Sequence, residues 1–310
     1  MADELFTGLA GVLKALPGTL VMSPDCPPEL AQALDDLALP LERVESSPSV
    51  ALSYAAGLAK GHGPVWVLGL SSTLLAENYE LWRRVICPEN LPLRLLGFAG
   101  LTGDGRGVAT QCLEDFALVR ALDGVRAFVP SSLSHLSRAL PSFGDQGPLY
   151  VRMSRQLTLG PEPEALVEEE HRGRRLLEGA HGTLIACGIM CKEAQKACEA
   201  LQSHGLRFGL IECPSPTHLP LGLLVQASRE SGLFVVAEEG KGSGGLAEAL
   251  CLALANLAPA QVVSLCARTS GQSGTSEELL AYYGLTSNDL ASLAAEAYSK
   301  RRIQRGNPDE

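Results

Sequence analysis

The chain has 310 residues, 46% of them hydrophobic, which is enough for about two globular domains with ordinary buried cores. Its formal net charge of −10 argues against a nucleic-acid-binding surface, which needs clustered Lys and Arg. No apolar stretch reaches the roughly 20 residues of a membrane span, and the N-terminus is acidic where a signal peptide is basic. We therefore expect a cytoplasmic protein with no nucleic-acid or membrane partner.

The nine cysteines indicate a reducing compartment. Their number is odd, the sequence contains no CxxC pair, and Cys187 and Cys266 lie in apolar stretches typical of buried strands. We expect buried free thiols in place of disulfides or a metal site.

Strand-like and helix-like patterns alternate through the first half of the chain. The predicted helices cover residues 5–16, 27–37, 48–60, 73–86, 113–122 and 132–140. The predicted strands cover residues 18–23, 41–45, 64–70, 91–99, 125–131 and 148–154. Residues 64–70 are apolar without alternation, as in a sheet covered on both faces.

A second alternating series follows a stretch rich in proline, glycine and charge. Its predicted strands cover residues 182–188, 206–213, 233–240 and 260–267, and its helices 190–204, 219–232, 244–257, 275–283 and 287–300. Such alternation predicts an α/β fold of two tandem domains, each a mostly parallel sheet flanked by helices. The predicted boundaries are 1–154 for the first domain, 155–180 for a linker, 181–303 for the second domain and 304–310 for a polar tail.

Two glycine-rich motifs have structural explanations. Residues 240–245 fit GxGxxG between a strand and a helix, but no acidic residue ends the next strand to bind a ribose. We interpret these glycines as allowing close helix packing. Gly103-Asp104-Gly105 starts like the magnesium-diphosphate motif of thiamine diphosphate enzymes, but residues 125–140 contain no asparagine to complete it. A turn is the simpler explanation, and we predict no metal site.

The stretch VESSPSVALSYAAGLA contains a strong helix start. Ser47 is a good N-cap, and Pro48 is pre-set for the first helical position. A helix that starts after a strand in an α/β protein often faces a ligand, yet this one offers no group for chemistry.

Several segments, in order, resemble one family. They are AAGLA at 55–59 with GHGPVWVLGLSST, GFAGLTGDGRGVATQCLEDFALVRAL, VPSSLSHLSRAL, GPLYVRMSRQ, GTLIACGIMCKEAQKACEAL, FVVAEEGKGSGGLAEAL and GTSEELLAYYGLT. Together they are similar to the C-terminal half of transketolases and 1-deoxyxylulose-5-phosphate synthases, from about residue 5 to 298. The resemblance implies a pyrimidine-binding domain followed by a transketolase C-terminal domain.

The resemblance also implies an incomplete enzyme. Family members carry a further domain that holds the diphosphate and Mg²⁺ of thiamine diphosphate, and in two-chain relatives a separate polypeptide supplies it. This chain would then be the C-terminal subunit of a split transferase that is active only with such a partner.

The cofactor pocket departs from the family pattern. The family's activating Glu falls at Pro48, with Glu45 a turn earlier, and its stacking aromatic residue falls at Leu74. An Arg of the family falls at Glu77 and a His at Thr110. By resemblance, the pyrimidine pocket comprises Pro48, Ser72, Leu74 and Tyr79.

Substrate-binding positions are better matched. The resemblance implies that Asp104, Gln111 and Arg155 bind substrate, and a guanidinium such as that of Arg155 suits a sugar phosphate. A structural ion pair at the domain edge is the alternative for Arg155.

Three hypotheses remain open. In the first, the chain is the partner-dependent transferase subunit. In the second, it is a non-catalytic homologue (a pseudoenzyme) that serves as an interaction or regulatory subunit. In the third, its changed pocket binds another small ligand. Each is compatible with a homodimer or a hetero-oligomer, because an isolated chain of this type exposes apolar interface.

Overall fold

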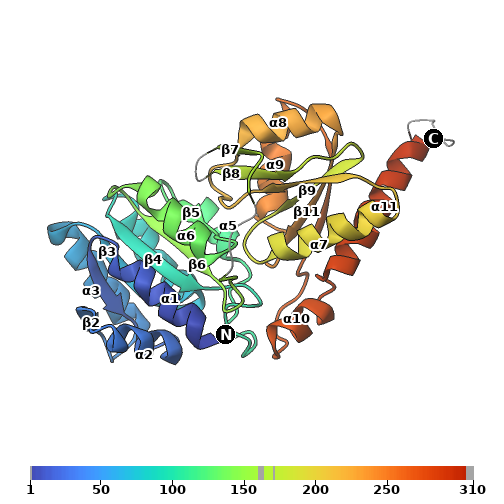
Figure 1. Cartoon of the computed structure of the whole chain (residues 1–310). Helices are drawn as coiled ribbons and strands as arrows, with labels where there is room; N and C mark the ends of the chain where they lie inside the picture. Colours follow the sequence, from blue (N-terminus) through green and yellow to red (C-terminus); the bar gives the residue numbers. More distant parts are fainter. Residues whose placement is uncertain (1, 160–163, 170–171, 305–310) are drawn as a thin grey trace.

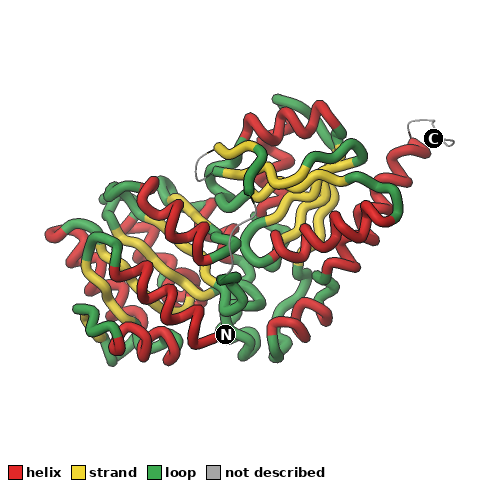
Figure 2. The backbone as a smooth tube through the Cα atoms, viewed as in Figure 1, coloured by secondary structure: helices red, strands yellow, loops and turns green. Residues whose placement is uncertain are grey.

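The computed structural model describes residues 2–159, 164–169 and 172–304. Figures 1 and 2 show two domains side by side, each built on a twisted sheet with helices on both faces. The predicted α/β fold with two mostly parallel sheets is therefore confirmed. No helix in the described part of the chain is both long and apolar enough to cross a bilayer.

The first sheet is parallel throughout, in the order β2-β1-β3-β4-β6-β5. Its strands are β1 (Thr19–Met22), β2 (Leu41–Arg43), β3 (Val65–Leu70), β4 (Leu93–Phe98), β5 (Arg126–Phe128) and β6 (Leu149–Met153). Every residue of β3, β4 and β6 is buried, as expected for strands covered on both faces.

Two apolar clusters cover the faces of this sheet. One face packs α1 (Ala2–Lys14), α2 (Pro28–Asp36), α6 (Leu133–Ala139) and the 3₁₀ turn η3 (Leu140–Phe143). The other packs α3 (Pro48–His62), η1 (Ser72–Glu77), α4 (Tyr79–Leu81), η2 (Trp82–Ile86) and α5 (Asp115–Arg120).

The helix predicted over 73–86 differs in detail, because η1 and η2 are π-helical on either side of a short α-helical turn. Two side chains bond carbonyls of the first turn: Asn78 Nδ2 donates to Thr73 O at 2.6 Å and Trp82 Nε1 to Leu74 O at 2.9 Å. These two donors bind carbonyl oxygens in the first π-helical turn, where the backbone hydrogen bonds differ from those of an α-helix.

The second sheet has the order β12-β11-β9-β10-β8-β7. Its strands are β7 (Val167–Glu169), β8 (Gly173–Leu177), β9 (Gly182–Ala186), β10 (Phe208–Glu212), β11 (Leu233–Glu238) and β12 (Gln261–Cys266). Strand β8 pairs antiparallel with β10 and with β7, and the other neighbours are parallel.

Consequently the predicted linker over 155–180 is too long, because β7 and β8 belong to the second sheet. Charged residues pair here in place of an apolar alternation, and Arg175 of β8 donates to Glu230. The predicted tail over 304–310 lies outside the described residues except for its first residue, which ends α11.

Helices cover the second sheet on both faces. On one face lie α7 (Met190–Ser203) and α11 (Ser287–Gln304), whereas α10 (Ser276–Tyr282) lies apart from the strands and adds Leu279 to the same apolar cluster. On the other lie α8 (Leu221–Glu230) and α9 (Leu246–Ala255).

The glycines at 240–245 serve helix packing, as predicted. Glu238, at the end of β11, accepts hydrogen bonds from Leu246 N (2.8 Å) and Ala247 N (3.2 Å) at the start of α9. A Cβ on Gly245 would lie 2.3 Å from Glu238 Oε2. The chain's own carboxylate therefore occupies the helix start where a dinucleotide fold binds phosphate.

All nine cysteines are free, as predicted. Cys187 is among the buried ones, whereas Cys266 is half-buried. Burial raises the pKa of Cys187 well above its ordinary value, so its thiol is a packing group.

A buried polar group, here called the seam cluster, joins the two domains. It comprises Thr102, Asp115, Tyr150, Arg152 and Glu239, all 5% exposed or less. Arg152 lies 3.4 Å from Asp115 Oδ2 and 3.5 Å from Glu239 Oε1. Tyr150 Oη donates to Asp115 Oδ2 at 2.7 Å, and Thr102 Oγ1 donates to Glu239 Oε2 at 2.7 Å. Residues of both chain halves thus share one set of buried charges.

Candidate functional site

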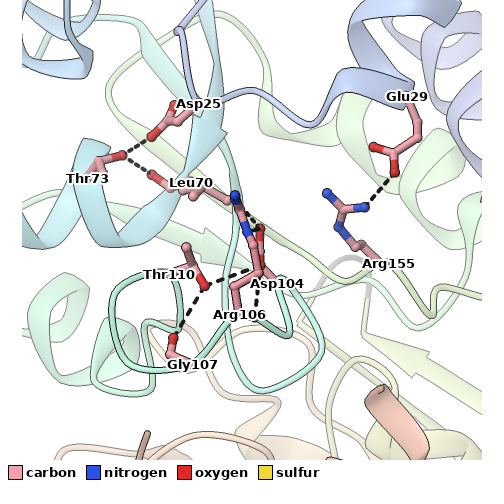
Figure 3. A network of polar contacts seen from close by, with 9 residues as sticks. All are labelled: Asp25, Glu29, Leu70, Thr73, Asp104, Arg106, Gly107, Thr110 and Arg155. Atoms are coloured by element: carbon pink, nitrogen blue, oxygen red, sulfur yellow. Dashed lines mark hydrogen bonds and ion pairs between the residues drawn. The ribbon is translucent and has the colours of Figure 1, made fainter. Parts of the chain in front are cut away.

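Polar side chains gather where the parallel strands of the first sheet end. Asp25 follows β1, Thr73 follows β3, Asp104 follows β4 and Arg155 follows β6. Figure 3 shows these residues facing a common region. Carboxyl ends of parallel strands meet at one edge of the sheet, where α/β proteins bind ligands. We refer to this region as the carboxyl edge.

Asp104 organises the loop after β4. Its carboxylate accepts from Arg106 N (3.1 Å) and, at 2.9 and 2.7 Å, from Arg106 Nε and Nη2. Thr110 Oγ1 donates to Asp104 Oδ1 at 3.2 Å and to Gly107 O at 3.3 Å. Burial opposes ionisation of Asp104, but the bonds and charge of Arg106 outweigh it and hold the pKa of Asp104 below its ordinary value. The turn predicted at this Asp is confirmed, and Arg106 takes up both carboxylate oxygens.

Arg155 lies at the same edge in an ion pair. Its Nη1 donates to Glu29 Oε1, on α2, at 2.9 Å, and its guanidinium lies 5.7 Å from the centre of the Phe6 ring. Arg155 Nε and Glu29 Oε2 are buried without a hydrogen-bond partner among the described residues. This pair therefore keeps unused hydrogen-bonding capacity on both sides.

Asp25 adds a third carboxylate. Thr73 Oγ1 donates to Asp25 Oδ2 and lies 3.0 Å from Leu70 O (Figure 3). Asp104 raises the pKa of Arg106 most, burial lowers it, and the negative charges of Asp25 and Glu29 raise it further. Asp25, Glu29, Thr73 and Arg106 are not among the residues predicted from the sequence. Asp25 and Thr73 each follow an apolar strand, and that position is a signal by which they could have been found.

Pro48 opens α3, as predicted. Ser47 Oγ accepts from Val50 N at 3.3 Å, and Pro48 occupies the first helical position, half-exposed. Glu45, one turn earlier, is exposed. The start of α3 thus carries a hydroxyl cap and a proline ring and no carboxylate of its own.

The other pyrimidine-pocket residues are turned largely inward. Leu74 is fully buried in the cluster of α3 and β3, and Ser72 is 8% exposed with a buried, unpartnered Oγ among the described residues. Tyr79 is half-buried and packs against the same cluster, whereas Glu77 is exposed. The Leu74 side chain is therefore a core residue here.

Gln111 connects the loop after β4 to the second domain. Its Nε2 donates to Gln272 O at 3.0 Å, and Gly271 N donates to its Oε1 at 3.4 Å. Both ends of the amide are therefore used within the chain, in contacts that link the first domain to the second.

The residues at the edge do not fit the activation of an aminopyrimidine. That chemistry requires a carboxylate that hydrogen-bonds the ring nitrogen, and Pro48 has neither a carboxylate nor an N–H. Over residues 2–159, 164–169 and 172–304, no group of three or more His, Cys, Asp or Glu side chains is placed to hold a metal ion. We derive no catalytic step through thiamine diphosphate from this chain's residues.

Comparison with known proteins identifies the architecture. Residues 171–290 match the family model of the transketolase C-terminal domain. A protein of Methanocaldococcus jannaschii named as a transketolase C-terminal section is 26% identical over 80% of this chain and 80% of its own length. The 1-deoxy-D-xylulose-5-phosphate synthase of Syntrophotalea carbinolica is 29% identical over 78% of this chain but 39% of its own length.

Solved structures extend this similarity to both domains. A chain described as "Split gene transketolase, inactive beta4 tetramer" superposes with a TM-score of 0.77 at 26% identity, covering 96% of this chain and 97% of that one. Transketolase from Leishmania mexicana has a TM-score of 0.76 at 16% identity, with 45% of its chain covered, and shows the shared fold. The chain is thus similar, over both domains, to the C-terminal half of transketolases and 1-deoxyxylulose-5-phosphate synthases.

Proposed function

We propose that this chain is the C-terminal subunit of a split, thiamine-diphosphate-dependent transferase of the transketolase type. A partner chain would carry the domain that binds the diphosphate and Mg²⁺. The observation that supports this most is the end-to-end match with a split-gene transketolase chain, in which 96% and 97% of the two chains are covered. The β4 tetramer of that protein is described as inactive, and we expect the same of this chain alone.

We propose a sugar phosphate as the substrate. The guanidinium of Arg155 suits a phosphate group, and its buried Nε has no partner among the described residues. Binding would have to compete with Glu29, whose Oε1 lies 2.9 Å from Arg155 Nη1. Asp104 is a weaker candidate because Arg106 already neutralises it.

A second candidate function is that of a pseudoenzyme, an interaction or regulatory subunit in the same type of assembly. The observation that favours it is Pro48 at the start of α3, where the family supplies the activating carboxylate. The buried Leu74 supports the same alternative, because a core leucine gives no ring stacking on a pyrimidine. Both candidates require a partner, as a homodimer or a hetero-oligomer.

Co-purification with an N-terminal transketolase-like subunit encoded next to this chain separates the two candidates. Calorimetry would titrate thiamine diphosphate with Mg²⁺ into the chain alone and into the pair, and a transketolase assay would follow. Binding and turnover by the pair alone support the transferase. Binding to neither sample would support the pseudoenzyme, and turnover by the isolated chain would contradict both.

Two variants test the residues proposed for substrate binding and for cofactor activation. Arg155→Gln should raise the KM for a sugar phosphate by about tenfold and leave cofactor binding unchanged, since one charge-assisted contact is lost. Pro48→Glu restores a carboxylate at the helix start, and a gain in cofactor affinity of the pair would identify this position as the defect.

A further inference from the structure

A groove of about 730 Å³ lies between the two domains, away from the carboxyl edge. Its first-domain wall comes from residues 119–126, which run from α5 to the amino end of β5. Its second-domain wall comes from residues 216–221, between β10 and α8, and from α9. The groove therefore lies at the opposite edge of the first sheet from Arg155.

The groove is lined by cationic side chains. Arg120, Arg126, Arg172 and His218 contribute to its walls, and the exposed Asp123 lies in the same loop without lining the groove. The whole chain has a formal charge of −10, so chance alone would place acids here more often than bases. A concave surface of one charge sign attracts ligands of the other.

Arg120 and Arg126 are bonded to backbone carbonyls, which are neutral, and neither has an ion pair among the described residues. Arg120 Nη1 donates to Gly244 O at 2.7 Å and to Gly245 O at 3.0 Å. Arg126 donates to the carbonyls of Phe143 and Gln146 and lies over the Phe143 ring. Arg172 is exposed, and the described residues give it no carboxylate partner.

The positive charge of Arg172 and Arg126 acts on His218, the histidine of the groove. Burial lowers the pKa of His218, and Arg172 and Arg126 lower it further. Thr217, beside it, places its hydroxyl 3.0 Å from His218 Nδ1 and accepts from Ala127 N at 3.0 Å. The last bond joins β5 of the first domain to the second, so the polar groups of the groove are fixed by contacts between the domains.

The remaining walls are apolar, including Val119, Leu122, Leu219 and Leu221. Apolar walls with a few convergent cationic groups, in a volume of several hundred Å³, are typical of small-molecule sites. Guanidinium groups in such a site favour phosphate oxygens, to which they donate charge-assisted hydrogen bonds. A simple inorganic anion would leave these apolar walls without contact.

We propose that this interdomain groove binds a small organic phosphate, with Arg172 and Arg126 on the phosphate and the apolar walls around its carbon portion. Such a ligand touches both domains and stabilises their relative position. The site is separate from the proposed transferase site, and its test needs neither the partner chain nor thiamine diphosphate.

The test is calorimetric titration of the purified full chain with glycerol 3-phosphate, repeated at several fixed ionic strengths. We expect saturable binding that weakens as salt rises. Arg172→Gln should weaken it about tenfold, and Arg172→Glu more, because a charge-assisted contact is removed or reversed. Since Arg172 is exposed, both variants should retain the wild-type melting temperature.

One matched variant and one mapping experiment make the result specific. Arg229→Gln, on the exposed end of α8 and outside both proposed sites, should leave the affinity unchanged. Hydrogen exchange should show phosphate-dependent protection of backbone amides at 216–222. The proposal is overturned if glycerol 3-phosphate does not bind at millimolar concentration, if Arg172→Glu binds as the wild type does, or if Arg155→Gln abolishes binding, which would place the ligand at the carboxyl edge.

Discussion

At the carboxyl edge, the Arg155 side chain is 29% exposed beside Glu29, and that of Arg106 is 70% exposed beside Asp104. In the seam cluster, the Arg152 side chain is 1% exposed between Asp115 and Glu239. Both regions pair arginines with carboxylates, but they differ in what a substitution would cost. Exposed ion pairs contribute little to stability, whereas removing one member of a buried set leaves an uncompensated charge.

This difference gives a physical reason for where the chain departs from its family pattern. Pro48, Glu77 and Thr110 all lie at or near the carboxyl edge, where the side chains are half-exposed or exposed, whereas Leu74 is a buried core residue. The three exposed or half-exposed positions can change with little loss of stability. The seam cluster has no such freedom, because it holds the two domains together.

The largest expected effect is that of Arg152→Met in the seam cluster. The substitution leaves Asp115 and Glu239 buried without their cation, so we expect a loss of about 3–5 kcal/mol in the free energy of unfolding. Urea denaturation followed by circular dichroism would measure it.

Arg83→Met is the matched control, since the Arg83 side chain is 55% exposed in a pair with Glu80. Its loss should stay within about 1 kcal/mol. Equal losses for the two variants would remove the distinction between seam and edge.

The sequence predicted the fold better than it predicted the site. Continuous apolar runs such as β3 and β4 signal buried parallel strands, and Ser47-Pro48 signals a helix start, because both depend on local pattern. Strands β7 and β8 were not predicted because both are short and contain charged residues in place of an apolar run. The pairing of Arg152 with Glu239 depends on how distant segments pack, which local pattern does not carry.

The second prediction concerns pH and Glu238, which lies next to the seam cluster. Burial raises the pKa of Glu238 from 4.5 to about 7, although bonds from Leu246 N and Ala247 N oppose the rise. Between these two pH values the folded state holds a proton that the unfolded state releases. Stability therefore falls with rising pH, by up to about 1.4 kcal/mol per pH unit from this group.

Glu238→Gln should flatten that fall, as measured by urea denaturation from pH 4.5 to 7. Glu199→Gln, on the exposed side of α7, should keep the slope of the wild type. An unchanged slope in Glu238→Gln would mean that this carboxyl is ionised in the folded protein throughout the range.

A smaller effect is expected at the helix start of the carboxyl edge. Ser47→Ala removes the cap that Val50 N donates to at 3.3 Å, and should cost about 1 kcal/mol of stability. Ser49→Ala, two residues on and exposed, should cost less than half of that. A cost for Ser47→Ala as large as that of Arg152→Met would show that the edge is as constrained as the seam.

The smallest effect is the coupling between Glu29 and Arg155. A double-mutant cycle with Glu29→Gln and Arg155→Gln should give a coupling below about 1 kcal/mol that shrinks further as salt is added. A weak, salt-sensitive coupling leaves Arg155 able to exchange Glu29 for a phosphate at modest cost. A strong coupling that salt does not change would make the pair a structural ion pair at the domain edge, and Arg155 would then belong with the seam cluster as part of the framework.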